Sequence, residues 1–104
     1  MKKNYSVFDG EKLQKQLHNY TEDFVIEYLE EMLEKNEQFK DVCTCEQCLL
    51  DIASFALSRL PAKYISSSKG NLHTKLQEFE QQLRVDLYST LTRAINLVKE
   101  NPRH

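Results

Sequence analysis

The sequence predicts a small all-α fold, and two observations support this fold class. The 104 residues contain only two glycines and two prolines, too few for the many turns of a β-sandwich or barrel. Apolar residues recur at intervals of three and four in four stretches, which is the period of an amphipathic helix. The length fits a single domain over residues 1–104, with flexible ends at 1–8 and 99–104.

Polar capping residues precede the first two predicted helices. Asp9 can cap a short helix, with Phe8 and Leu13 at the spacing of a hydrophobic staple. Thr21 is expected to cap a second helix that ends near Asn36. The apolar rows of this second helix are formed by Phe24, Val25, Tyr28, Leu29, Met32 and Leu33. The opposite face is acidic and consists of Glu27, Glu30, Glu31 and Glu34, so the helix is amphipathic.

The third predicted helix spans about residues 45–60. Thr44 and Gln47 have the spacing of a capping box, and Pro61 ends the helix. Apolar side chains cover most of its circumference, and a helix of this kind is normally buried on all sides. We therefore expect it to be the central helix of the core, with Arg59 on its apolar side.

A fourth helix is predicted from about residues 70–72 to Glu100. At 1.5 Å per residue it would be about 42 Å long, whereas a compact chain of this length is about 33 Å across. Its second half also has apolar residues off the main stripe, namely Val85, Tyr88 and Leu97. A helix that extends beyond its domain with two apolar faces predicts a homodimer through this helix.

All three cysteines lie within six residues, at Cys43, Cys45 and Cys48. The last two would lie at the first and fourth positions of the third helix, on one side, and Cys43 can fold back to join them. Thiolates at a helix N-terminus are also favoured by the helix dipole. The spacing predicts a structural zinc site that holds the loop at 37–44 against the third helix.

Structural zinc binds four ligands, so the three cysteines need one more. The candidates for the fourth ligand are His18, Asp41, Asp51, His73, a residue of a partner chain, and water. Two alternatives to zinc stay open. One is a thiol-based redox motif, and the other is a group of three buried or reactive thiols without a metal.

Charge is unevenly distributed along the chain, whose net charge is −2. Residues 1–51 hold twelve acids and six bases, whereas residues 52–77 hold four bases and no acid. This basic window predicts a phosphate pocket, because guanidinium and hydroxyl groups bind phosphate and tyrosine can stack on a base. The pocket residues are Arg59, Lys63, Tyr64, Ser66, Ser67, Ser68 and Lys69. The alternatives are a solvated basic loop, serines that only form turns, and an arginine that bonds carbonyls at the helix end.

Several function classes are not expected. The basic window is too small for duplex nucleic acid, which takes about six to ten phosphate contacts. No apolar run approaches the ~20 residues that span a bilayer, and no apolar signal segment follows Met1. The sequence contains no recognisable catalytic triad, Gly-rich phosphate loop or spaced carboxylate pair, so we do not expect an enzyme. We expect a cytoplasmic protein.

Three segments of the chain resemble the late competence protein family ComFB. They are Asn19–Val25, the cysteine segment Cys43–Cys48, and the segment from Asp51 to Gly70. The most specific part is the string Ala56-Leu-x-Arg-Leu-Pro-x-x-Tyr64. The resemblance covers about residues 18–95.

This resemblance implies a small, helical, dimeric, cytosolic regulator. Family members that have the cysteine cluster bind zinc, and cyanobacterial members are receptors for cyclic dinucleotides that affect pili or competence. The resemblance therefore implies a cyclic dinucleotide, cyclic di-GMP or cyclic di-AMP, bound by Arg59 and the loop at 61–70. The alternative is a protein–protein adaptor, in which the acidic face of the second helix or the long fourth helix binds a protein partner.

Overall fold

A computed structural model describes residues 8–65 and 72–102 of the chain. It contains α1 (Gly10–Gln16), α2 (Tyr20–Lys35), the 3-10 helix η2 (Glu37–Phe39), α3 (Glu46–Arg59) and α4 (Leu72–Glu100). No strand occurs in these two ranges, so the chain is all-α, as expected. Residues 1–7 of the flexible end expected at 1–8 lie outside the described residues, as do Ser66, Ser67, Ser68 and Lys69. Of the flexible end expected at 99–104, residues 99–102 are described, and Lys99 and Glu100 form the end of α4.

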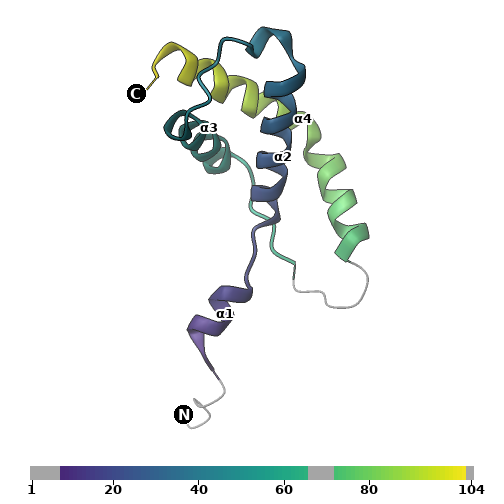
Figure 1. The fold of residues 1–104 in the computed structure, drawn as a ribbon. Coiled ribbons are helices and arrows are strands. Elements are labelled where there is room, and N and C mark those ends of the chain that lie inside the picture. Colours follow the sequence, from purple (N-terminus) through teal and green to yellow (C-terminus); the bar gives the residue numbers. More distant parts are fainter. Residues whose placement is uncertain (1–7, 66–71, 103–104) are drawn as a thin grey trace.

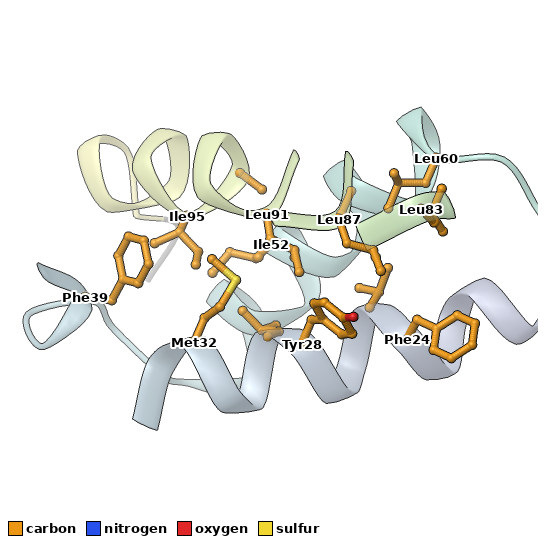
Figure 2. Packing of buried hydrophobic residues seen from close by; sticks show 14 of the residues in the cluster. Phe24, Tyr28, Met32, Phe39, Ile52, Leu60, Leu83, Leu87, Leu91 and Ile95 are labelled. Carbon is orange, nitrogen blue, oxygen red and sulfur yellow. The ribbon is translucent and has the colours of Figure 1, made fainter. Parts of the chain in front are cut away.

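The core lies where α2, α3 and α4 pack against one another (Figure 1). Figure 2 shows the side chains that meet there, among them Phe24, Tyr28, Met32, Ile52, Leu87, Leu91 and Ile95. The amphipathic pattern of α2 is confirmed, because its buried residues repeat at helical intervals from Phe24 to Met32. Phe39 and Val42 are also buried, so the segment between α2 and α3 is anchored in the same core.

The apolar circumference of α3 is only partly covered. Cys48, Ile52 and Ala56 are its buried residues, whereas Leu50 is 53% exposed. The expectation of a helix buried on all sides is therefore wrong for a single copy of the chain. The physical reason is that α2 and α4 cover one stripe of α3 and the rest of its circumference faces outward.

The long helix α4 extends beyond the packed body. Its buried residues all lie between Leu83 and Ile95, and residues 72–82 contribute none. The molecule measures 57 × 32 × 18 Å and has a radius of gyration of 17.4 Å, compared with about 13 Å for a compact chain of this length. Val85 is 76% exposed, and Tyr88 and Leu97 are each 42% exposed, although the Tyr88 ring lies 5.2 Å from that of Tyr28. The described residues therefore leave much of the second apolar face of α4 uncovered. Within the described ranges, none of the helices combines the length and apolar character that crossing a bilayer requires.

The first helix, α1, stands apart from the other helices (Figure 1). Asp9 is its N-cap, as predicted, and its side chain accepts hydrogen bonds from the amides of Glu11 and Lys12. However, α1 buries no residue, and both members of the expected hydrophobic staple, Phe8 and Leu13, are exposed. The cap is therefore present, but no residue of α1 is buried against the body.

Two helix starts differ from the predicted ones. Asn19, and not Thr21, is the N-cap of α2, and its side chain accepts a hydrogen bond from the Thr21 amide. Cys45, and not Thr44, is the N-cap of α3, and its sulfur accepts from the Cys48 amide at 3.4 Å. The observed cap of α2 lies two residues before the predicted one, and the observed cap of α3 lies one residue after it. Thr21 and Cys45 make further contacts that are described below.

Candidate metal centre and basic loop

The three cysteines come together at the start of α3. Cys43 ends the loop that follows η2, Cys45 is the helix cap, and Cys48 lies in the first turn. Their Sγ atoms all lie within 4.8 Å of one another. Cys48 is completely buried, whereas Cys43 and Cys45 are half-buried. The predicted cluster is therefore formed by residues that come from the loop, the cap and the helix.

This donor set fits a zinc ion. Tetrahedral coordination with Zn–S bonds of about 2.3 Å places two sulfurs about 3.8 Å apart, close to the spacing that the three sulfurs already have. The pKa of the Cys45 thiol lies below its ordinary value of 9.0, first because the Cys48 amide donates to its sulfur and second because of a hydrogen bond with Cys43. The cluster thus favours the thiolate form that binds metals.

The fourth ligand is not found among the described residues. The group of potential ligands at this place consists of the three cysteines alone, so Asp41, Asp51 and His73 are not part of it. His18 lies near the opposite end of α3, because its neighbour Tyr20 bonds Lys63, which follows that helix. The 14 residues of α3 separate the two places by about 21 Å. Of the original candidates, a residue of a partner chain and a water molecule remain.

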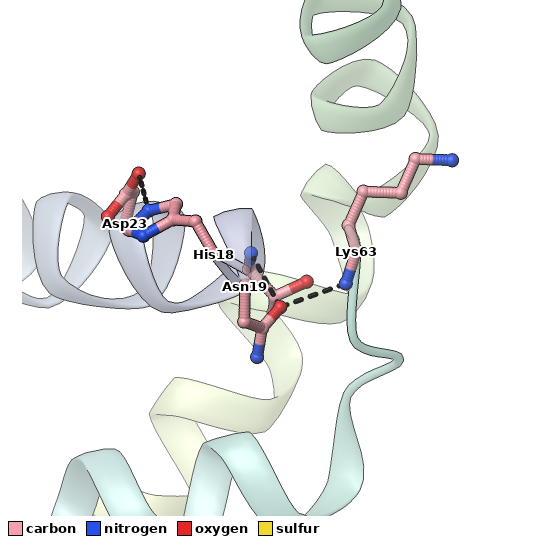
Figure 3. A network of polar contacts seen from close by, with 5 residues as sticks. His18, Asn19, Asp23 and Lys63 are labelled. Carbon is pink, nitrogen blue, oxygen red and sulfur yellow. Dashed lines mark hydrogen bonds and ion pairs between the residues drawn. The ribbon is translucent and has the colours of Figure 1, made fainter. Parts of the chain in front are cut away.

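A second set of contacts joins the other end of α3 to the start of α2 (Figure 3). The Asn19 side chain accepts from the Lys63 amide at 2.8 Å, and the Tyr20 amide donates to the Lys63 carbonyl at 2.7 Å. The buried Thr21 hydroxyl donates to the Pro61 carbonyl at 2.6 Å. These contacts, which we call the Asn19–Lys63 junction, fix residues 61–63 against α2. They explain why Asn19 is the cap and Thr21 is not.

The basic loop continues from this junction into a hollow beside α4. Lys63, Tyr64 and Ile65 line one side of this space of about 500 Å³, and α4 supplies Lys75, Glu78, Phe79 and Gln82. The Lys63 Nζ atom is 5.1 Å from the centre of the Phe79 ring. Two ammonium groups and two aromatic rings therefore surround one hollow, with one carboxylate.

Arg59 is exposed, so the expectation of a buried arginine is wrong. Its guanidinium lies 3.6 Å from the centre of the Phe55 ring and donates to the Phe55 carbonyl at 3.2 Å. It is not among the residues that line the Lys63 hollow. The reason is its place in the last turn of α3, where the backbone offers carbonyls without helical partners and no other helix covers the side chain.

Two residues near these groups were not predicted from the sequence. Phe79 faces Lys63, and the Arg93 guanidinium lies 5.9 Å from the Phe55 ring that Arg59 also covers. Both belong to α4 and lie beyond the basic window at 52–77, Phe79 by two residues and Arg93 by sixteen. Only the packing of α4 against α3 brings them there, so no local pattern could have indicated them.

The comparisons with known proteins cover most of the chain. Residues 18–102 match the family described as late competence development protein ComFB. The solved structure of the late competence protein ComFB from Bacillus subtilis has a TM-score of 0.64 to this chain and 23% sequence identity. That alignment covers 85% of this chain and 96% of the other, and at this identity it shows a shared fold. Among curated proteins no sequence matches. Three helices packed around one core, a cysteine cluster at the start of α3 and a match over residues 18–102 show that this chain belongs to the ComFB family.

Proposed function

We propose that this ComFB-family chain is a non-enzymatic regulatory protein of the cytoplasm, which works as a homodimer stabilised by structural zinc. The observation that carries this proposal is the cysteine cluster at the start of α3, with its sulfurs within 4.8 Å of one another. Structural zinc sites hold loops and helix ends in small domains. In this chain the ion would tie the loop after η2 to the core through Cys43, Cys45 and Cys48.

Metal analysis of protein purified without added zinc tests this site. The expected result is about one zinc per chain, because a structural site of thiolates binds zinc tightly. Cys48→Ser is expected to lose the metal. Thr44→Ala, a change at an exposed residue between two of the ligands, is the matched control and should keep it. A zinc content near zero in the unchanged protein would contradict the proposal.

The exposed face of α4 supports the proposed homodimer. Val85, Tyr88 and Leu97 leave apolar surface open on a helix that extends beyond its own body. Light scattering at micromolar concentration should give twice the chain mass of 12.3 kDa. Val85→Asp should shift the mass toward a single copy, because it would place a charge in the interface. A single-copy mass for the unchanged protein would refute the dimer.

The hollow beside Lys63 and Tyr64 supports a cyclic dinucleotide as the regulatory ligand. Lys63 and Lys75 offer charge for phosphates, and Tyr64 and Phe79 offer rings on which bases stack. Arg59, at the C-terminal end of α3, and Ser66, Ser67, Ser68 and Lys69, which lie outside the described residues, remain part of the proposed site on the family resemblance. Calorimetry with cyclic di-GMP and cyclic di-AMP should detect binding of one of them. Tyr64→Ala, at an exposed side chain, should weaken that binding without changing stability by more than about 0.5 kcal/mol.

A protein–protein adaptor is the second candidate, and an acidic hollow between α2 and α4 favours it. Glu27, Glu30, Glu31, Glu34 and Glu80 line this space of about 640 Å³. Glu80 accepts a hydrogen bond from Tyr28 at 2.8 Å and lies 4.0 Å from Arg84, and Glu31 pairs with Lys35. The remaining carboxylates would suit a partner with a basic surface. No heat with either nucleotide at high micromolar concentration would favour the adaptor.

A further inference from the structure

An apolar groove runs between α2 and α3. Thr44 and Glu46, on either side of Cys45, line one end of it, and it shares no lining residue with the Lys63 hollow. Its floor is formed by Ile26, Leu29, Leu33, Leu49, Leu50 and Ala53. Ile26 is 57% exposed and Leu50 is 53% exposed, although both are large aliphatic side chains. The charged residues that line it are Glu30, Glu34 and Glu46, so every charge at its edge is negative. Such a groove fits an apolar helix face with basic residues beside it.

The segment that contains α1 has the complementary character. Phe8, Leu13 and Leu17 are all at least half exposed, and Lys12 and Lys15 lie beside them in sequence. A helix of seven residues is not stable alone in water, because nucleation costs more than so few hydrogen bonds return. The ComFB match begins at residue 18, so α1 lies outside the matched residues.

Within one chain, α1 does not lie in the α2–α3 groove. The Asn19–Lys63 junction fixes the backbone at residues 19–20, and His18 bonds Asp23 at 2.8 Å. These contacts fix the backbone from which α1 extends, and α1 stands apart from α2 and α3 (Figure 1). Within residues 8–65 and 72–102, α1 faces a hollow with Tyr64 and Ile65, where Leu13 and Leu17 stay 50% and 57% exposed. The described part of the chain therefore leaves the apolar face of α1 open to another molecule.

We propose that α1 of one chain binds, through Leu13 and Leu17, in the α2–α3 groove of a second copy. Lys12 and Lys15 of the first copy then lie near Glu30 and Glu34 of the second. This contact is separate from the α4 face in the proposed homodimer, and it involves neither the metal nor a nucleotide. Its failure would leave the zinc content and ligand binding of the proposed function unaffected, and Val85→Asp, which changes the α4 face alone, tests the homodimer separately.

A tryptophan placed in the first segment would report this contact directly. The chain has no tryptophan, so Phe8→Trp gives a single signal from an exposed position. The expected result is a blue-shifted emission that develops as the protein concentration rises. Adding Leu50→Glu should abolish the shift, or move its midpoint to a concentration about tenfold higher or more, because a charge replaces apolar floor. Ser54→Glu adds the same charge on an exposed part of α3 outside the groove and should change nothing.

Mixing two variants then distinguishes binding of α1 to a second copy from binding of α1 to its own chain. The Phe8→Trp, Leu50→Glu protein is mixed with a Leu13→Asp, Leu17→Asp protein, which has an intact groove and no tryptophan. The blue shift should return on mixing, because the intact first segment of one protein meets the intact groove of the other. If mixing fails to restore a shift that Leu50→Glu removed, α1 binds its own chain and the proposal is wrong. A shift that Leu50→Glu does not affect, or no shift in any protein, overturns it as well.

Discussion

The two ends of α3 are held in different ways. At its C-terminal end, the Asn19–Lys63 junction uses hydrogen bonds of 2.6 to 2.8 Å between groups that the chain itself supplies. At its N-terminal end, three sulfurs converge around the first turn, with a set of donors that fits zinc. One end is therefore complete within the protein, whereas the other is proposed to depend on an ion.

This difference follows from what each end connects. The C-terminal end is followed at once by Pro61 and by a loop that pairs with the start of α2, so backbone groups are available on both sides. The N-terminal end is preceded by a loop whose anchors, Phe39 and Val42, are apolar and offer no hydrogen bonds through their side chains. Metal coordination is a means of fixing such a loop in a domain too small for a larger core.

Removal of zinc should produce the largest effect and should act on one end only. Urea unfolding is measured once with a chelator and once with free zinc at about a thousand times its Kd. The free energy of unfolding is expected to be lower by about 4 kcal/mol in the chelator. Hydrogen exchange should accelerate at the amides near Cys45 and Cys48 before it accelerates at Lys63. Equal unfolding midpoints with chelator and with zinc would show that the two ends do not differ in this way.

Asn19→Ala should give the second largest effect, at the opposite end. The substitution removes the cap of α2 and the acceptor for the Lys63 amide together. The expected loss is about 2 kcal/mol in the free energy of unfolding. Zinc content should not change.

Asn36→Ala is the matched control for this change. Asn36 also caps a helix, but its side chain accepts only from the Gln38 amide, two residues away. It should therefore cost about 1 kcal/mol or less. A cost equal to that of Asn19→Ala would mean that the contact with Lys63 adds nothing to the cap.

Thr21→Val should have a smaller effect, because the shape of the side chain is nearly kept. Thr21 is fully buried, and the change leaves the Pro61 carbonyl without its 2.6 Å donor. The expected loss is about 1 to 2 kcal/mol. Thr74→Val, at an exposed position of α4, should stay within about 0.5 kcal/mol of the unchanged protein. A neutral Thr21→Val would indicate that the carbonyl finds water and that the junction rests on Asn19 alone.

The sequence predicted the helices better than it predicted their exact ends. The apolar rows of α2, the stop of α3 before Pro61 and the length of α4 are all local patterns, and each was confirmed. The caps of α2 and α3 were wrong because two nearby residues could each cap. At α2 the long-range partners Pro61 and Lys63 decided between Thr21 and Asn19, whereas at α3 the Cys45 sulfur accepts the local bond from the Cys48 amide. The partial burial of α3 could not be predicted either. An apolar helix surface indicates that the helix packs against something, but it does not tell whether another helix of the same chain or a second molecule packs there.

The candidate sites also differ in how far the sequence predicts them. The cysteine cluster was predictable because all three sulfurs lie within one loop and one helical turn. The basic loop was predictable as a charge pattern, but its surroundings were not. Lys63 faces Phe79 and Arg59 stacks on Phe55 near Arg93, and these contacts depend on how α4 crosses the other helices.

Arg59→Ala should give the smallest change in stability. The guanidinium stacks on an exposed side of Phe55, and such a contact contributes about 0.5 to 1 kcal/mol. Arg59→Lys should keep part of this, since it retains a positive charge near the C-terminal end of α3 and loses the planar stack. Both can be measured as shifts of the urea midpoint.

The small size of this effect is what makes Arg59 useful as a probe of the proposed ligand site. If Arg59→Ala costs less than 1 kcal/mol in stability, any loss of calorimetric binding by this variant reports a contact with the ligand and not a damaged fold. A cost of 2 kcal/mol or more would instead show that the arginine holds the C-terminal end of α3 together with Asn19 and Thr21. It would then be a structural residue, and the proposed ligand site would have to rest on Lys63, Tyr64 and the loop that follows them.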